Sequence, residues 1–209
     1  MANSNEMFDD LLTKKESFFI PEAKEKKEYK APNVRGEFYG HIKNATQKQV
    51  EWNKDGEKFK AIVYNYDFEV AKENESQKYT YEHYKDGSEQ TSMGKDYIGR
   101  IYKGSGVFRF LEPEDGDDFI SNASGNRNYQ RFCETLQVEI PTKTVEMNGE
   151  SVDVQALPCL DSSEITGRPV IAVIDTGKPY TWKGKQVTPH VVKFVKKWEG
   201  GEVSNDIPF

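Results

Sequence analysis

The sequence has few cysteines and histidines and no long apolar run. It contains two cysteines, Cys133 and Cys159, and three scattered histidines, so it offers neither a disulfide framework nor the ligand spacing of a zinc site. No stretch approaches the roughly 20 apolar residues that a membrane-spanning helix needs. The polar, acidic segment from Met1 to Glu6 has no feature of a secretion signal. These absences predict a cytoplasmic protein with reduced thiols, no membrane association, and no cofactor or metal.

Leucine is also scarce, and this predicts the fold class. Six leucines stand against sixteen valines and eleven isoleucines, and 12% of the residues are aromatic. Because β-branched and aromatic residues favour strands over helices, we expect a mainly β protein. A length of 209 residues fits one domain with insertions, or at most two small domains.

Five segments have the pattern of strands and one has the pattern of a helix. Apolar residues recur at spacings of three and four from Tyr129 to Leu136, which predicts a helix over 126–136. The apolar run within 168–176 predicts a strand that is buried on both faces. Three strands, one helix and two strands is the chain order of the OB-fold, a five-stranded Greek-key barrel. The predicted strands are residues 36–52, 58–71, 97–111, 168–176 and 185–198.

Two polar stretches, residues 72–96 and 141–167, interrupt this pattern. Asp86-Gly87 in the first and Asn148-Gly149 in the second are turn-forming dipeptides, so both stretches are expected to be inserted hairpin excursions. The predicted organisation is an N-terminal arm, an OB-fold DNA-binding domain and a flexible acidic tail, over residues 1–35, 36–198 and 199–209 respectively.

The net charge of −6 hides a segregation of charge along the chain. Residues 168–198 hold seven basic residues and one acidic residue, a local charge of +6. Residues 199–209 carry −3, and the first 167 residues carry −9. A local positive field attracts a polyanion, although a lysine-rich, solvated hairpin would give the same pattern.

The basic segment has the composition of a surface that binds single-stranded nucleic acid, where cations follow the backbone and aromatic rings stack on bases. In an OB-fold the loop between the last two strands overhangs the ligand groove, and here Tyr180 and Trp182 alternate with lysines. Trp52 in the first hairpin would lie opposite, with residues of the second and third strands as the floor. Packing of these rings in the core is the alternative. The predicted nucleic-acid-binding residues are Lys178, Tyr180, Trp182, Lys183, Lys185, Lys193, Trp52, Lys54, Tyr64, Tyr66, Lys103 and Arg109.

The chain ends in Asp206-Ile207-Pro208-Phe209 after a polar lead-in. Ile207 and Phe209 suit an apolar pocket, whereas Asp206 and the terminal carboxylate suit a basic rim, so we expect a docking peptide. An acidic residue followed by Ile-Pro-Phe closely resembles the C-terminal tip of bacterial and phage single-stranded DNA-binding proteins. The anionic tail is also expected to compete with DNA for the basic segment.

The chain as a whole is similar to phage-encoded single-stranded DNA-binding proteins, over residues 36–198 in pattern and over 206–209 in motif. The resemblance implies a protein without catalytic residues that coats single-stranded DNA during phage DNA replication, recombination and repair in the host cytoplasm. It implies partners that dock on the tip, such as a polymerase, helicase, nuclease or recombinase. Homo-oligomers occur in this family. The lead-in is shorter than the Gly/Pro/Gln-rich tail of bacterial members, and Ser204-Asn205 replaces further acidic residues.

Three other functions stay open. An OB-fold groove accepts RNA as well as DNA, so the first is an RNA-binding or regulatory OB-fold protein. The second is a metal-dependent nuclease that uses Asp115, Asp117 and Asp118, although this loop lacks calcium-loop spacing and the chain lacks a phosphate-binding loop. The third is a virion or scaffold protein, in which the charge segregation would be incidental.

Overall fold

The structure is a computed structural model that describes residues 31–54, 56–83, 86–111, 123–147 and 149–203. Most of the predicted N-terminal arm lies outside these residues, as do the acidic loop from Asp115 to Asp118 and the tip from Asp206 to Phe209. Within the described part of the chain, none of the helices has the length and apolar character needed to cross a membrane.

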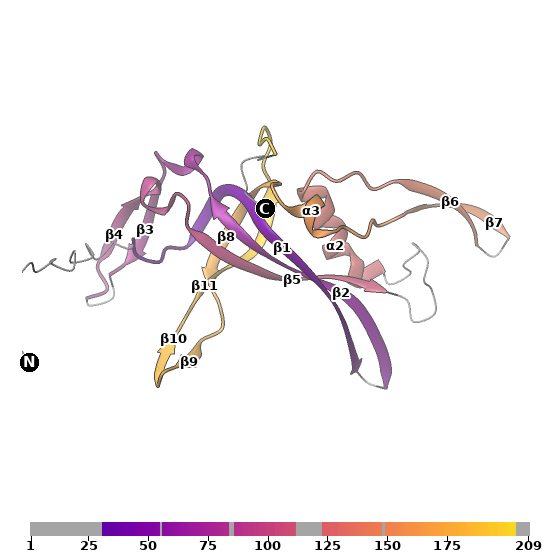
Figure 1. Cartoon of the computed structure of the whole chain (residues 1–209), viewed down its shortest axis with the longest axis horizontal. Helices are drawn as coiled ribbons and strands as arrows, with labels where there is room; N and C mark the ends of the chain where they lie inside the picture. Colours follow the sequence, from indigo (N-terminus) through magenta and orange to yellow (C-terminus); the bar gives the residue numbers. More distant parts are fainter. Residues whose placement is uncertain (1–30, 55, 84–85, 112–122, 148, 204–209) are drawn as a thin grey trace, which may run out of the picture. The chain divides into compact units, whose positions relative to one another are not determined.

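Five strands close into a barrel (Figure 1). In order around the barrel they are β1 (Gly36–Lys54), β2 (Glu57–Val70), β5 (Ile101–Leu111), β11 (His190–Lys197) and β8 (Pro169–Thr176). β5 and β11 run parallel and pair at Gly104 and Val192, whereas the other neighbours are antiparallel. The predictions of a mainly β chain and of a five-stranded barrel are confirmed.

Strand β1 pairs with β8 through its first residues and with β2 through most of its length. Its residues Gly36–His41 pair with β8, and its residues from Gly40 onwards pair with β2. A side chain at Gly40 would place its Cβ atom 2.1 Å from the carbonyl oxygen of Glu69 and 2.6 Å from the ring of Phe68. Glycine is therefore required where β1 passes from one neighbour to the other.

Alternate residues of the strands fill the barrel interior. On β2 the side chains of Tyr64, Tyr66 and Phe68 point inward and are at most 5% exposed. β8 alternates in the same way, with Val170 buried and Ile171 half-buried. The prediction that this strand is buried on both faces is therefore wrong, because a barrel strand turns one face inward and the other outward.

Helix α2 (Ala123–Thr135) packs against the barrel core, and the predicted helix is present. Its apolar stripe is buried, with Phe132 stacked on Tyr66 at a ring-centroid distance of 5.7 Å. Gln137, two residues after the helix, has a left-handed φ of 58°. The amides of Gln137 and Val138 donate back to carbonyls of the last turn at 3.1 and 2.9 Å, which is the Schellman pattern of helix termination.

The remaining elements are hairpins and short helices. Each of the two predicted excursions contains one hairpin, and a third hairpin lies between β8 and β11 (Figure 1). The hairpins are β3 (Lys78–Glu82) with β4 (Glu89–Met93), β6 (Thr142–Met147) with β7 (Glu150–Gln155), and β9 (Tyr180–Trp182) with β10 (Lys185–Val187). The short helices are η1 (Lys72–Asn74), η2 (Gly94–Tyr97) and α3 (Ser162–Ile165).

The third hairpin corrects the predicted start of the last strand. Lys185 belongs to β10, and β11 begins only at His190. Pro189 separates them because it has no N–H group to continue a ladder. Its carbonyl oxygen instead accepts the amide of Gly177 at 2.7 Å, which closes the base of the hairpin.

Tyr79 joins the β3–β4 hairpin to the barrel. Its ring stacks on Phe38 of β1 at a centroid distance of 4.1 Å and an interplanar angle of 12°. Its hydroxyl donates to the carbonyl of Glu37 at 3.0 Å. The buried amide of Asn74 donates to the carbonyl of Tyr39 at 2.7 Å and accepts its N–H at 2.9 Å. The first excursion therefore extends the packing of the barrel core.

The buried tyrosines make the fold sensitive to alkaline pH. Burial, opposed by the neighbouring Arg100, raises the pKa of Tyr102 from 10.0 to about 12. Because the folded-state pKa is raised, this group's stabilising contribution is complete below pH 10 and is lost as the pH rises to about 12. We expect the Tm to fall across this interval. In Tyr102→Phe the free energy of unfolding should also fall with pH, but with a smaller slope. The two slopes should differ by up to about 1.4 kcal/mol per pH unit. Thermal unfolding at several pH values checks this, and equal slopes in the two proteins would contradict it.

Candidate nucleic-acid interface

The outer face of β1, β2 and β5 carries four aromatic rings, which we term the outer aromatic cluster: Trp52, Phe59, Phe108 and Phe110. Trp52 pairs with Phe59, and the two phenylalanines of β5 pair with outward residues of β2, so all four rings share one face. Trp52 stacks on Phe59 at 5.7 Å and meets the edges of Phe108 and Phe110 at 6.3 and 5.7 Å. The rings are half-buried against one another and do not belong to the barrel core.

Aromatic rings on the outside of a barrel provide a surface on which flat molecules stack. Trp52 was predicted from the sequence, whereas the three phenylalanines were not. Two patterns in the sequence could have located them. Phe108 and Phe110 recur with the period of a strand, and Trp52 and Phe59 are equidistant from the Asp55-Gly56 turn.

A groove of about 340 Å³, here the outer groove, lies further along the same face. Asn44 and Asn65 line it on β1 and β2, and Lys103 and Ser105 line it on β5. The ammonium group of Lys103 lies 3.0 Å from a carboxylate oxygen of Asp67, and its side chain is 82% exposed. Lys103 therefore points outward from β5, with part of its charge balanced by Asp67.

The β9–β10 hairpin presents the most exposed tryptophan and tyrosine of the described residues. Trp182 is 58% exposed and Tyr180 is 51% exposed. Lys183 and Gly184 form its two-residue turn with φ angles of 48° and 75°, which fits a type I′ turn. The ammonium group of Lys183 lies 4.5 Å from the centroid of the Trp182 ring. Trp182 is therefore outside the core, and Lys178, Lys185 and Lys193 are exposed as well.

Three of the predicted site residues point into the protein instead. Tyr64 is 1% exposed, and its hydroxyl accepts a hydrogen bond from Tyr129 at 3.3 Å. Tyr66 is 5% exposed, and burial raises its pKa. Arg109 is also 5% exposed and donates to the carbonyl of Leu157 at 3.3 Å. The prediction that these residues form the floor of the site is wrong, because the inward face of β2 and β5 packs on α2. Lys54 ends β1, and its side chain is not among those described.

No protein-family model, curated protein or solved structure matches this chain. Its function therefore has to be inferred from the arrangement of its own side chains.

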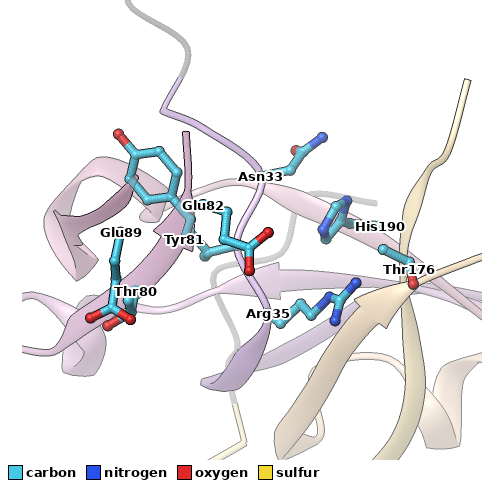
Figure 2. Close-up of a pocket in the computed structure, with 9 residues that line it drawn as sticks. Asn33, Arg35, Thr80, Tyr81, Glu82, Glu89, Thr176 and His190 are labelled. Atoms are coloured by element: carbon cyan, nitrogen blue, oxygen red, sulfur yellow. The ribbon is translucent and has the colours of Figure 1, made fainter. Parts of the chain in front are cut away.

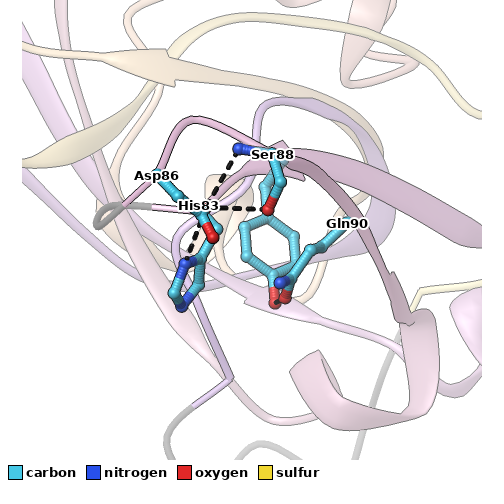
Figure 3. A network of polar contacts seen from close by, with 5 residues as sticks. His83, Asp86, Ser88 and Gln90 are labelled. Atoms are coloured by element: carbon cyan, nitrogen blue, oxygen red, sulfur yellow. Dashed lines mark hydrogen bonds and ion pairs between the residues drawn. The ribbon is translucent and has the colours of Figure 1, made fainter.

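His83, Asp86 and Ser88 form a polar network in the β3–β4 turn (Figure 3). One carboxylate oxygen of Asp86 lies 3.1 Å from Nδ1 of His83 and accepts the Ser88 hydroxyl at 2.8 Å. Hydrogen bonds from Ser88 and His83 hold the pKa of Asp86 below its usual value. In a catalytic triad the serine would bond to the histidine, so this network stabilises a turn. Among the described residues, no group of three or more His, Cys, Asp or Glu is placed to hold a metal ion.

A cavity of about 410 Å³ lies between the β3–β4 hairpin and residues at the ends of β8 and β11 (Figure 2). Its lining includes Arg35 and His190, together with the carboxylates of Glu82 and Glu89. Burial, followed by the positive charges of Arg35 and Arg100, lowers the pKa of His190. The carboxylates of Glu82 and Glu89 beside Arg35 and His190 make the cavity unfavourable for a polyanion. The cavity is therefore not part of the candidate interface.

The residues that lead to the C-terminal tip contact β1. The ring of Trp198 lies 5.2 Å from that of Tyr39 and 5.5 Å from that of His41. The Nε2 atom of His41 lies 3.0 Å from the carbonyl oxygen of Glu202. The predicted tail therefore begins with residues that contact the barrel, and its tip lies outside the described residues.

Proposed function

We propose that the barrel is an OB-fold domain that binds single-stranded DNA without sequence specificity. The order of the strands around the barrel and the position of α2 between its third and fourth strands in the chain support this assignment. The ligand surface of an OB-fold is the outer face of its second and third strands, with the loops that join strands 1–2 and 4–5. The corresponding parts here are the outer face of β2 and β5, the β1–β2 hairpin and the β9–β10 hairpin.

The outer aromatic cluster carries the proposal. Its four rings lie on the solvent side of the strands that form the OB-fold ligand surface. Tyr180 and Trp182 add two exposed rings on the β9–β10 hairpin. Each stack of a base on an aromatic ring contributes about 1–3 kcal/mol, and every base has a flat face. Such a surface binds an unpaired strand with little regard to its sequence.

Exposed lysines supply the electrostatic part of the interface. Lys103 lies on β5, and Lys178, Lys183 and Lys185 lie on or beside the β9–β10 hairpin. These groups attract the phosphate backbone and release its bound counterions, so the affinity should fall as salt is added. The interaction breaks no covalent bond. A duplex hides its base faces in its own stack, and this favours the unpaired strand.

The tip extends the proposal to partners. We infer that the protein acts in phage DNA replication and recombination and that Asp206-Ile207-Pro208-Phe209 docks a replication or repair protein. The support for this part is the sequence resemblance of the tip and the segregation of charge along the chain.

A titration with poly-dT, single-stranded RNA and duplex DNA at two salt concentrations tests the proposal through tryptophan fluorescence. We expect strong quenching by poly-dT, weaker quenching at the higher salt concentration, and none by the duplex. Quenching by RNA alone would favour an RNA-binding protein, and no quenching by any of the three would favour a structural protein. A magnesium-dependent loss of substrate would indicate a nuclease. In the same titration, a chain that ends at Val203 should bind poly-dT more tightly and respond less to salt if the tail competes with DNA.

A further inference from the structure

The seam between β5 and β11 opens into a second groove, here the seam groove, of about 340 Å³. The two strands pair at Gly104 and Val192. Each then carries a bulge in the pairing with its other neighbour, β5 with β2 and β11 with β8. On β5 the bulge sets Ser105 and Gly106 opposite the single residue Asn65, and Gly106 has a left-handed φ of 85°. On β11 the extra residue is Lys193. The groove lies beside these bulges, and α2 lines it together with the two strands.

The side chains of the seam groove suit an anion that carries a flat group. Arg131 and Asn128 line it from α2, and both are exposed. Lys193 and Phe194 line it from β11, where the bulge turns both side chains outward. Phe194 is 53% exposed, which is unusual for so large an apolar ring. A guanidinium group, an ammonium group and an accessible ring therefore face one space.

The charge of the seam groove distinguishes it from three other cavities of the described residues. None of the residues that line it is acidic, whereas the outer groove contains Asp67 and the cavity beside His190 contains two glutamates. A fourth cavity, beside Trp198, contains Glu73 and Glu199. In a chain with a net charge of −6, a groove lined by two cations and no acid is favourable for a phosphate group.

The seam groove adjoins the proposed DNA-binding face. Tyr66 and Ser105 line both the outer groove and the seam groove, so the two spaces meet at the bulge of β5. A strand that crosses β2 and β5 in the outer groove would reach Arg131 and Lys193 next.

We propose that the seam groove binds a second stretch of the same single strand, with a phosphate between Arg131 and Lys193 and a base stacked on Phe194. This inference rests on the proposed function and extends it. The strand then turns around the edge of the barrel from β5 toward α2. The protein contacts more nucleotides than its outer face alone can hold, and oligonucleotides too short to reach the seam miss these contacts.

Binding of dT oligomers of increasing length to Arg131→Ala/Lys193→Ala tests the seam groove. The matched control is Arg127→Ala/Lys197→Ala, which removes the same charges from exposed residues of α2 and β11 that do not line the groove. We expect the shortest oligomers to bind both variants equally. Oligomers that reach the seam should bind Arg131→Ala/Lys193→Ala, the groove variant, more weakly than the control. The slope of log affinity against log salt concentration should be smaller by roughly 0.7 for each lost phosphate contact. Phe194→Ala should lower the affinity for the longer oligomers only, by about 5- to 150-fold.

Two results would overturn the inference in distinguishable ways. If the groove variant and its control bind every oligomer with the same affinity and salt slope, the strand does not enter the seam, while the proposed function stands. If the unaltered protein binds no single-stranded DNA at any length, the proposed function fails and the seam groove fails with it. Circular dichroism of each variant before titration ensures that only folded proteins are compared.

Discussion

Replacing Trp182 with alanine is expected to weaken poly-dT binding by about 5- to 150-fold and to leave the Tm unchanged. The ring is 58% exposed at a hairpin tip and contributes nothing to the core, so its loss should not affect folding. Lys183 sits over the ring at 4.5 Å and would place a positive charge beside a stacked base. The variant therefore removes both a stacking surface and the partner that orients this lysine.

Two other variants make this result specific to stacking. Trp182→Tyr keeps an aromatic ring and should retain most of the affinity. Trp198→Ala removes a tryptophan that packs on Tyr39 and His41, so it should lower the Tm without a matching loss of poly-dT affinity. Fluorescence anisotropy of a labelled oligonucleotide measures the affinity independently of the tryptophans. Equal affinities for Trp182→Ala and the unaltered protein would remove the β9–β10 hairpin from the interface.

Replacing Phe38 with alanine is expected to lower the free energy of unfolding by about 3–5 kcal/mol. Phe38 is 0% exposed and lies at the centre of an aromatic group that joins three parts of the chain. Its ring stacks on Tyr79 of β3, meets the edge of Tyr97 in η2 at 5.5 Å and lies 6.0 Å from Tyr102 of β5. The loss is a large share of the roughly 5–15 kcal/mol that stabilises a typical domain.

Phe194→Ala is the matched control for this change. It removes the same side chain from an exposed position, and surface substitutions usually change stability by less than about 0.5 kcal/mol. Urea unfolding followed by circular dichroism gives both values. If the two variants lose similar stability, Phe38 does not hold the barrel and the first excursion together.

The strands and the helix could be predicted because their sequence patterns are strong. Which face of each strand points into the core could not be predicted. β2 has apolar residues on both sides: Ile62 and Tyr64 face the core, and Phe59 and Val63 lie on the other face. Periodicity separates the two sets without saying which is inside. The packing of Tyr64 and Tyr66 on α2 decides the question, and it depends on contacts between residues more than sixty positions apart.

Arg109 shows why residue type alone misleads at a binding site. A positive charge on the third strand was interpreted as a phosphate contact. The side chain of Arg109 instead lies on the same inward face of β5 as that of Val107. It is accommodated because its guanidinium group reaches the carbonyl of Leu157. That partner comes from the segment after β7, whose course the sequence does not predict. Trp182 was predicted from its place in a lysine-rich loop, with core packing as the alternative, and its exposure of 58% excludes that alternative.

The double pairing of β1 also sets the order in which the barrel is completed. The β1–β2 hairpin closes across a two-residue turn, whereas Gly40 must meet Val170, 130 positions later in the chain. Pairings between such distant residues pay a high loop-closure entropy and slow the folding reaction. During synthesis, the edge of β1 that awaits β8 stays without its neighbour until the ribosome has passed Thr176. A nascent or truncated chain therefore presents an open strand edge to other chains, which is the usual starting point for aggregation.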